Sequence, residues 1–123
     1  MRSVSGDEVT VSRSAERSAE NESTFRAANE GIEGKTSELV FSEQQPTPYL
    51  CECEEERCTT IIRLTLGEYE SVRAHPRRFI LAPGHESPQD RVVSEGERFT
   101  VVEKTGEEGR LVEAHDPRSS EFR

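Results

Sequence analysis

The uneven spread of apolar residues limits what this chain can fold into. Leu, Ile, Val and Phe together number 25 of 123 residues, about the one-fifth level below which a highly charged chain tends to stay unfolded. Nineteen of the 25 lie within residues 39–114, and the first 24 residues hold only three valines. We therefore expect one ordered domain, over residues 37–117, with a core small enough to need a metal ion or a partner chain as a staple.

Composition also predicts disorder at both ends. Residues 1–14 are rich in Ser and in charge and show no sustained hydrophobic period. Segments of this kind cannot bury enough apolar surface to offset the entropy of folding. We expect a disordered tail over residues 1–14 and a disordered C-terminus over residues 118–123.

An N-terminal helix is predicted over residues 15–34, which are rich in Ala, Glu and Arg. Phe25 and Ile32 lie seven residues apart and give it one narrow apolar face. Gly31 and Gly34 are expected to end the helix. A face this thin does not stabilise a helix alone, so we expect it to dock on the domain or to contact a protein partner.

Short β-type runs predict an α+β fold for the domain, with a small, mostly antiparallel sheet, one short internal helix and the N-terminal helix. Thr65 and Glu68 form a capping box that starts the internal helix, which ends before Pro76. Gly106 and Gly109 lie between the last two runs and predict a hairpin. The expected strands are residues 39–41, 60–64, 78–81, 91–93, 99–103 and 110–113, where residues 91–93 also fit a short helix.

The charge balance argues against two classes of function. The formal net charge is −9, which disfavours binding to nucleic acid and to anionic membranes. The sequence contains no apolar run long enough for a transmembrane helix, and its first residues lack the apolar region of a signal peptide. We therefore expect a cytoplasmic protein in a reducing environment.

Three cysteines, Cys51, Cys53 and Cys58, lie close together in the sequence. In a reducing compartment, clustered cysteines bind metal or react as thiols more often than they form disulfides. Structural zinc takes four tetrahedral ligands, usually Cys thiolates and His nitrogens. The Cys-x-Cys-x4-Cys spacing is compatible with zinc, although it differs from the usual Cys-x2-Cys pair. The sequence therefore predicts a zinc site.

Strand pairing selects the fourth ligand. If the strand at 78–81 runs antiparallel to the strand at 60–64, its end brings His85 back beside the cysteines. Parallel pairing would instead place His75 nearer, through a connection of about the minimum length. We expect antiparallel pairing, and hence a site made of the three cysteines and His85. A glutamate of the acidic loop that carries the cysteines is the remaining alternative.

These observations predict a zinc-stabilised binding or regulatory module of otherwise unknown function. The alternative is a small thiol-dependent redox protein or enzyme. The glutamates at positions 52 and 54–56 argue against it, because they should raise the pKa of a nearby thiol and weaken it as a nucleophile. The sequence also lacks the motifs of serine hydrolases and zinc hydrolases.

Four blocks of the sequence resemble those of a group of small uncharacterised bacterial proteins. The resemblance spans roughly residues 22–117. It implies that the cysteines and the Pro-Gly-His block belong to one domain, and it implies no particular activity. The blocks are Cys-Glu-Cys-x4-Cys at 51–58, Glu-Tyr-Glu-x-Val-Arg-x2-Pro-x-Arg-Phe at 68–79, Pro-Gly-His at 83–85 and Val-Val-Glu-Lys at 101–104.

Overall fold

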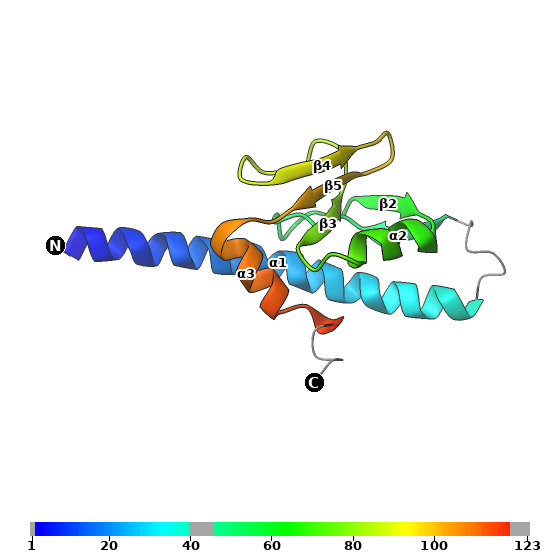
Figure 1. Ribbon diagram of the computed structural model, residues 1–123, viewed down its shortest axis with the longest axis horizontal. Helices are drawn as coiled ribbons and strands as arrows, with labels where there is room; N and C mark the ends of the chain where they lie inside the picture. Colours follow the sequence, from blue (N-terminus) through cyan, green and yellow to red (C-terminus); the bar gives the residue numbers. More distant parts are fainter. Residues whose placement is uncertain (1, 40–45, 119–123) are drawn as a thin grey trace.

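The computed structural model describes residues 2–39 and 46–118, with side chains described for 15–36 and 46–118. It confirms the predicted α+β class, with an N-terminal helix and antiparallel strands (Figure 1). The strands form two small sheets, β1-β2 and β3-β5-β4. The elements are α1 Arg2–Leu39, β1 Thr47–Leu50, β2 Ile61–Leu64, α2 Leu66–Arg73, β3 Arg78–Leu81, β4 Arg91–Glu95, β5 Thr100–Glu103 and α3 Gly106–Ala114.

Helix α1 is longer at both ends than the predicted range of 15–34. It begins at Arg2, so residues 2–14 are helical rather than disordered, and it continues through Gly31 and Gly34 to Leu39. Residues 1–39 contain no proline, and a glycine costs a helix interior only about 1 kcal/mol relative to alanine. Neither glycine is therefore sufficient to stop the helix. Its N-terminal part projects beyond the rest of the molecule (Figure 1).

Local signals predicted several elements correctly. The Thr65 hydroxyl accepts from the Glu68 amide at 3.1 Å, and the Glu68 carboxylate accepts from the Thr65 amide at 2.9 Å. This reciprocal capping box starts α2. Strand β3 has the predicted bounds, and residues 91–93 belong to strand β4 rather than to a helix. Leu39 ends α1, and the remainder of the strand predicted at 39–41 lies outside the described residues.

The predicted hairpin at the end of the domain is wrong, because residues 110–113 belong to helix α3. Both glycines have structural roles other than a hairpin turn. Gly106 has a φ of 62°, a conformation that favours glycine, at the turn from β5 into the helix. A Cβ on Gly109 would lie 2.6 Å from the backbone oxygen of Lys104, so glycine allows α3 to approach the end of β5 closely.

The expected pairing of 60–64 with 78–81 is also wrong. Strand β2 pairs with β1, and β3 pairs with β5, in both cases antiparallel. Strand β1, which begins at Thr47 and includes Pro48, is not among the strands expected from the sequence. Because proline is rare inside strands, the local sequence does not indicate this partner of β2.

The core contains few large apolar side chains, and among the described side chains of α1 the only buried apolar one is the small Ala19. The other buried side chains of α1 are polar: Glu22, Arg26 and Asn29. Phe25 and Ile32, which were predicted to form its apolar face, are only half buried. Helix α1 therefore docks through specific polar contacts more than through apolar burial. The buried core residues elsewhere include Tyr49, Leu64, Tyr69, Phe79, Ile80, Leu81, Val102 and Val112.

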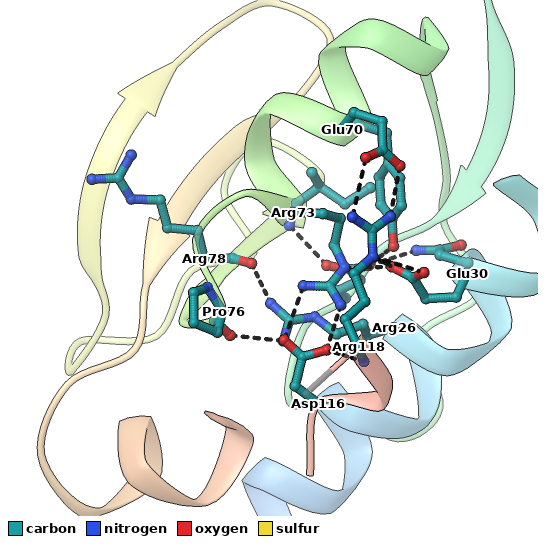
Figure 2. Close-up of polar contacts among 12 residues, drawn as sticks. Arg26, Glu30, Glu70, Arg73, Pro76, Arg78, Asp116 and Arg118 are labelled. Atoms are coloured by element: carbon teal, nitrogen blue, oxygen red, sulfur yellow. Dashed lines mark hydrogen bonds and ion pairs between the residues drawn. The ribbon is translucent and has the colours of Figure 1, made fainter. Parts of the chain in front are cut away.

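A buried ion-pair network joins α1 to α2 and to the segment after α3 (Figure 2). The Asp116 carboxylate accepts from Arg73 at 2.5 Å and lies 3.6 Å from the Arg26 guanidinium. Arg26 lies over the Phe79 ring, 3.6 Å from its centroid, and donates to the backbone carbonyls of Pro76, before β3, and of Arg78, at its start. Burial lowers the pKa of Arg26 to about 10, so the side chain stays charged at neutral pH and needs its anionic partner.

Arg118 extends this network to the solvent-exposed side. Its guanidinium pairs with Glu30 of α1 at 3.0 Å and with Glu70 of α2 at 2.6 Å (Figure 2). Sequence analysis placed Arg118 in a disordered C-terminus, whereas the structure shows it fixed by two carboxylates. The rest of that predicted segment, residues 119–123, lies outside the described residues.

Replacing Asp116 with Asn should lower the free energy of unfolding by about 3 kcal/mol, because Arg26 and Arg73 would remain buried without their shared counter-charge. Urea unfolding measures the change. Glu113→Gln is the control: its ion pair with Arg77 at 2.8 Å is largely exposed, and removing it should cost roughly 0.5 kcal/mol or less. Equal losses in the two variants would contradict a structural role for the buried network.

Candidate functional site

The structure brings all four predicted ligand residues together. One ligand atom each from Cys51, Cys53, Cys58 and His85 lies within 4.8 Å of the others. The Nδ1 atom of His85 is 3.5 Å from the Cys51 sulfur and 3.6 Å from the Cys58 sulfur. Cys51 and Cys53 are buried, Cys58 is half buried and His85 is exposed. This cysteine–histidine cluster can hold a metal ion at the surface of the domain.

The chain after β1 runs beside the end of β3, which explains how His85 reaches the cysteines without pairing between β2 and β3. The Glu52 amide donates to the Ile80 carbonyl at 2.8 Å. The Ala82 amide donates to the Cys51 sulfur at 3.1 Å. The His85 amide then closes a turn on the Ala82 carbonyl at 3.0 Å, so the turn after β3 places the imidazole over the sulfurs.

The dimensions of the cluster fit a tetrahedral metal. With Zn–S bonds of about 2.3 Å and Zn–N bonds of about 2.0 Å, neighbouring ligand atoms of a tetrahedral zinc site lie roughly 3.5–3.8 Å apart. The two measured sulfur–nitrogen distances, 3.5 and 3.6 Å, match this spacing. Three thiols and one imidazole form a soft, closed donor set of the kind found in structural zinc sites.

The two buried thiols share one proton. The hydrogen bond that the Cys51 thiol donates to Cys53, together with burial, raises the pKa of Cys51. Accepting that hydrogen bond lowers the pKa of Cys53 to about 5. The pair therefore loses one proton readily and holds the second tightly. A metal ion that takes both sulfurs as thiolates must displace this shared proton, which makes its binding pH-dependent.

Glu52 lies between the two buried cysteines but points the other way. Its side chain is fully buried, and its carboxylate accepts from the Ile80 amide at 3.0 Å, the Asn29 amide group at 2.9 Å and the Tyr69 hydroxyl at 3.2 Å. Burial raises its pKa. From the sequence, this residue was expected to belong to the acidic loop that carries the cysteines. The order Leu-Cys-Glu-Cys-Glu at residues 50–54 carries a signal for this arrangement. Residues two apart in an extended chain share a side, so the cysteines lie on one face and Glu52 on the other.

The alternative fourth ligands are not in the cluster. Among the described residues, His75 does not belong to it and lies on the connection between α2 and β3. The Glu52 carboxylate faces away from the sulfurs, as described above. The Glu54 carboxylate accepts from the Ser18 hydroxyl of α1 at 2.9 Å. Of the ligands considered from sequence, the geometry therefore favours His85.

A second group of acidic side chains, Glu22, Glu54 and Glu108, also lies within 4.8 Å. Sequence analysis did not identify it. The buried ammonium of Lys104 lies 2.6 Å from Glu22, 2.7 Å from Asp90 and 3.8 Å from Glu108. Lys104 thus supplies the positive charge at the contact between α1 and α3, with Asp90 as its anionic partner, and we interpret this group as a structural polar network.

Comparisons with protein-family models, with curated protein sequences and with solved structures found no match to this chain. Among the described residues, no helix is long and apolar enough to cross a membrane. The site geometry is therefore the basis for any assignment of function.

Glu22→Gln should flatten the pH dependence of stability. Burial and a hydrogen bond with Glu108 raise the pKa of Glu22 to about 10 from its ordinary 4.5, so folding takes up a proton between these pH values. The wild-type protein should lose roughly 1 kcal/mol of stability per unit as the pH rises above 5, because the folded carboxyl keeps a proton that the unfolded one releases. Gln cannot ionise, and this contribution should vanish.

Unfolding free energies measured from pH 5 to pH 8 test this expectation. Glu16→Gln is the matched control, because Glu16 lies on the same helix with an exposed side chain. It should leave the slope unchanged. Identical slopes for the wild type and Glu22→Gln would show that Glu22 is ionised in the folded protein.

Proposed function

We propose that Cys51, Cys53, Cys58 and His85 bind one zinc ion, and that zinc stabilises a small binding or regulatory module. The observation that carries the proposal is the convergence of three sulfurs and one imidazole nitrogen from two separate chain segments. The near-tetrahedral spacing of His85 to two of the sulfurs supports zinc. So does the Ala82 amide, which donates to the Cys51 sulfur and stabilises a thiolate there.

A stabilising role follows from the number of ligands. Four protein ligands fill a tetrahedral zinc ion, whereas catalytic zinc keeps one position for water or substrate. The small apolar core makes such a staple useful. For the partner, we propose a protein that contacts α1, because the N-terminal part of this helix projects beyond the body of the molecule (Figure 1). We also propose a cytoplasmic location, because the reducing conditions there keep cysteine thiols free to bind zinc.

The purified protein should contain one zinc ion per chain by elemental analysis. Cys53→Ser and His85→Ala should each weaken zinc binding by at least about 100-fold, since loss of a direct ligand exceeds the 10–100-fold effect of losing a supporting residue. A chelator should lower the thermal midpoint of the wild type, because zinc bound to the folded state contributes to its stability.

His75→Ala is the matched control, since it removes an exposed histidine outside the cluster. It should retain the wild-type zinc content and midpoint. A protein that carries no metal, takes up no added zinc and has the same midpoint with and without chelator would contradict the zinc site.

A thiol-dependent activity is the second candidate, and one observation favours it. The pKa of Cys53 is lowered to about 5 by the hydrogen bond with Cys51, which favours the thiolate form of this sulfur. Cys53 and His85 also line a surface hollow of about 280 Å³, so a small opening of this hollow would expose the buried sulfur. Low pKa and access are the two properties of reactive cysteines.

Alkylation of the cysteines by iodoacetamide at pH 7 distinguishes the two candidates. For a zinc site, we expect zinc to slow alkylation of the cluster by at least about tenfold, because the coordinated thiolates are blocked. Peptide mapping by mass spectrometry identifies the modified residue. Rapid alkylation of Cys53 in protein that binds no zinc would favour the thiol-dependent activity instead.

A further inference from the structure

The extended segment at residues 50–54 has two faces with different partners. Its odd-numbered positions, Cys51 and Cys53, contribute sulfurs to the cysteine–histidine cluster. Its even-numbered positions contact helix α1: Leu50 through its backbone, Glu52 through its carboxylate and Glu54 through both. This alternation is what an extended chain produces, since successive side chains point to opposite sides. The proposed metal site and the docking site of α1 are therefore the two sides of one strand-like segment.

Asn29 is the main contact on the helix side. Its side-chain amide donates to the Leu50 carbonyl at 2.9 Å and accepts from the Leu50 amide at 2.8 Å. It also donates to the Glu52 carboxylate at 2.9 Å. About two turns earlier in α1, Asn21 donates to the Glu54 carbonyl at 2.9 Å. Each contact requires a definite position of the backbone at residues 50–54.

Helix α1 is also held by ion pairs outside this segment: Arg26 and Glu30 pair with Asp116, Arg73 and Arg118, and Glu22 lies beside Lys104. Among the described side chains of α1, the buried ones other than Ala19 are polar or charged, and buried Asn29 would lose its partners if the segment moved. Desolvated polar groups without hydrogen bonds oppose burial strongly. Apolar packing tolerates small shifts, whereas this set of directional contacts does not.

We infer that metal occupancy of the cysteine–histidine cluster controls the docking of α1. The inference rests on the zinc site proposed above. With zinc bound, the sulfurs of Cys51 and Cys53 are fixed, and the opposite face of the segment presents its amide, carbonyl and carboxylate to α1. Loss of zinc loosens the segment and weakens its contacts with Asn29 and Asn21, so α1 opens more often while the β3-β5-β4 sheet stays folded. The zinc site then acts as a switch on the docking of α1.

Amide hydrogen exchange of the full chain, with and without bound zinc, tests the switch. Removal of zinc should speed exchange of the α1 amides at residues 18–30 by about 100-fold, because they open without global unfolding. Exchange of the β5 amides of Val101 and Val102 should change by less than about tenfold. This difference separates release of α1 from loss of the whole fold.

Coupling between two sites is reciprocal, so weakening the helix contact should weaken zinc binding. Asn29→Ala should lower zinc affinity about tenfold, as for other residues that support metal ligands. Thr65→Ala is the control for a general loss of stability. It removes the capping hydroxyl of α2, which should cost the fold about 1 kcal/mol, and it should change zinc affinity by less than about twofold. Competition with a chromophoric chelator measures both affinities.

The outcomes separate the switch from the zinc site itself. Zinc binding with unchanged exchange of α1 would overturn the switch and leave the zinc site intact. Equal acceleration in α1 and β5 would also overturn it, since zinc would then hold the entire fold. Equal zinc affinities for Asn29→Ala and Thr65→Ala would likewise overturn the switch. Absence of zinc binding by the wild type would overturn both proposals.

Discussion

The buried carboxylate of Glu52 is the interaction on which the arrangement of this protein depends. A carboxylate in the interior needs hydrogen-bond donors, and here they come from three elements: Asn29 of α1, Tyr69 of α2 and the Ile80 amide of β3. One side chain thus fixes the relative positions of two helices and a strand. Because its neighbours in the chain are cysteines, the same burial turns both thiols toward the opposite side, where the turn after β3 brings His85.

The polar docking of α1 accounts for a fold with so few apolar residues. Arg26, Arg73 and Asp116 form a buried network that satisfies its charges internally (Figure 2). Such networks contribute little net stability compared with apolar packing, but they are costly to break and they specify one geometry. Stability must then come from a small apolar core around Phe79 and the stacked rings of Tyr49 and Tyr69, to which a metal ion in the cysteine–histidine cluster would add.

The sequence predicted those features that depend on neighbouring residues. The capping box of Thr65, the strand at 78–81 and the proximity of His85 to the cysteines each follow from local patterns or from the direction of a strand. Features set by distant contacts were missed. Gly109 resembled a turn residue, although its role is close packing of α3 against Lys104. Glu52 resembled a solvated charge, because no pattern in one sequence shows that Asn29 and Tyr69 lie next to it.

The pairing argument that selected His85 was wrong in its premise, although the structure places this residue beside the sulfurs. Its position depends on backbone contacts between the cysteine segment and β3, through the Glu52 amide and the Ala82 amide. These hydrogen bonds position Cys51 next to the end of β3. Cys58 and His85 lie on surface turns with fewer such constraints. A metal ion would therefore join Cys58 and His85 to the segment that α1 and β3 contact, and this shared segment links occupancy of the cluster to the helix behind it.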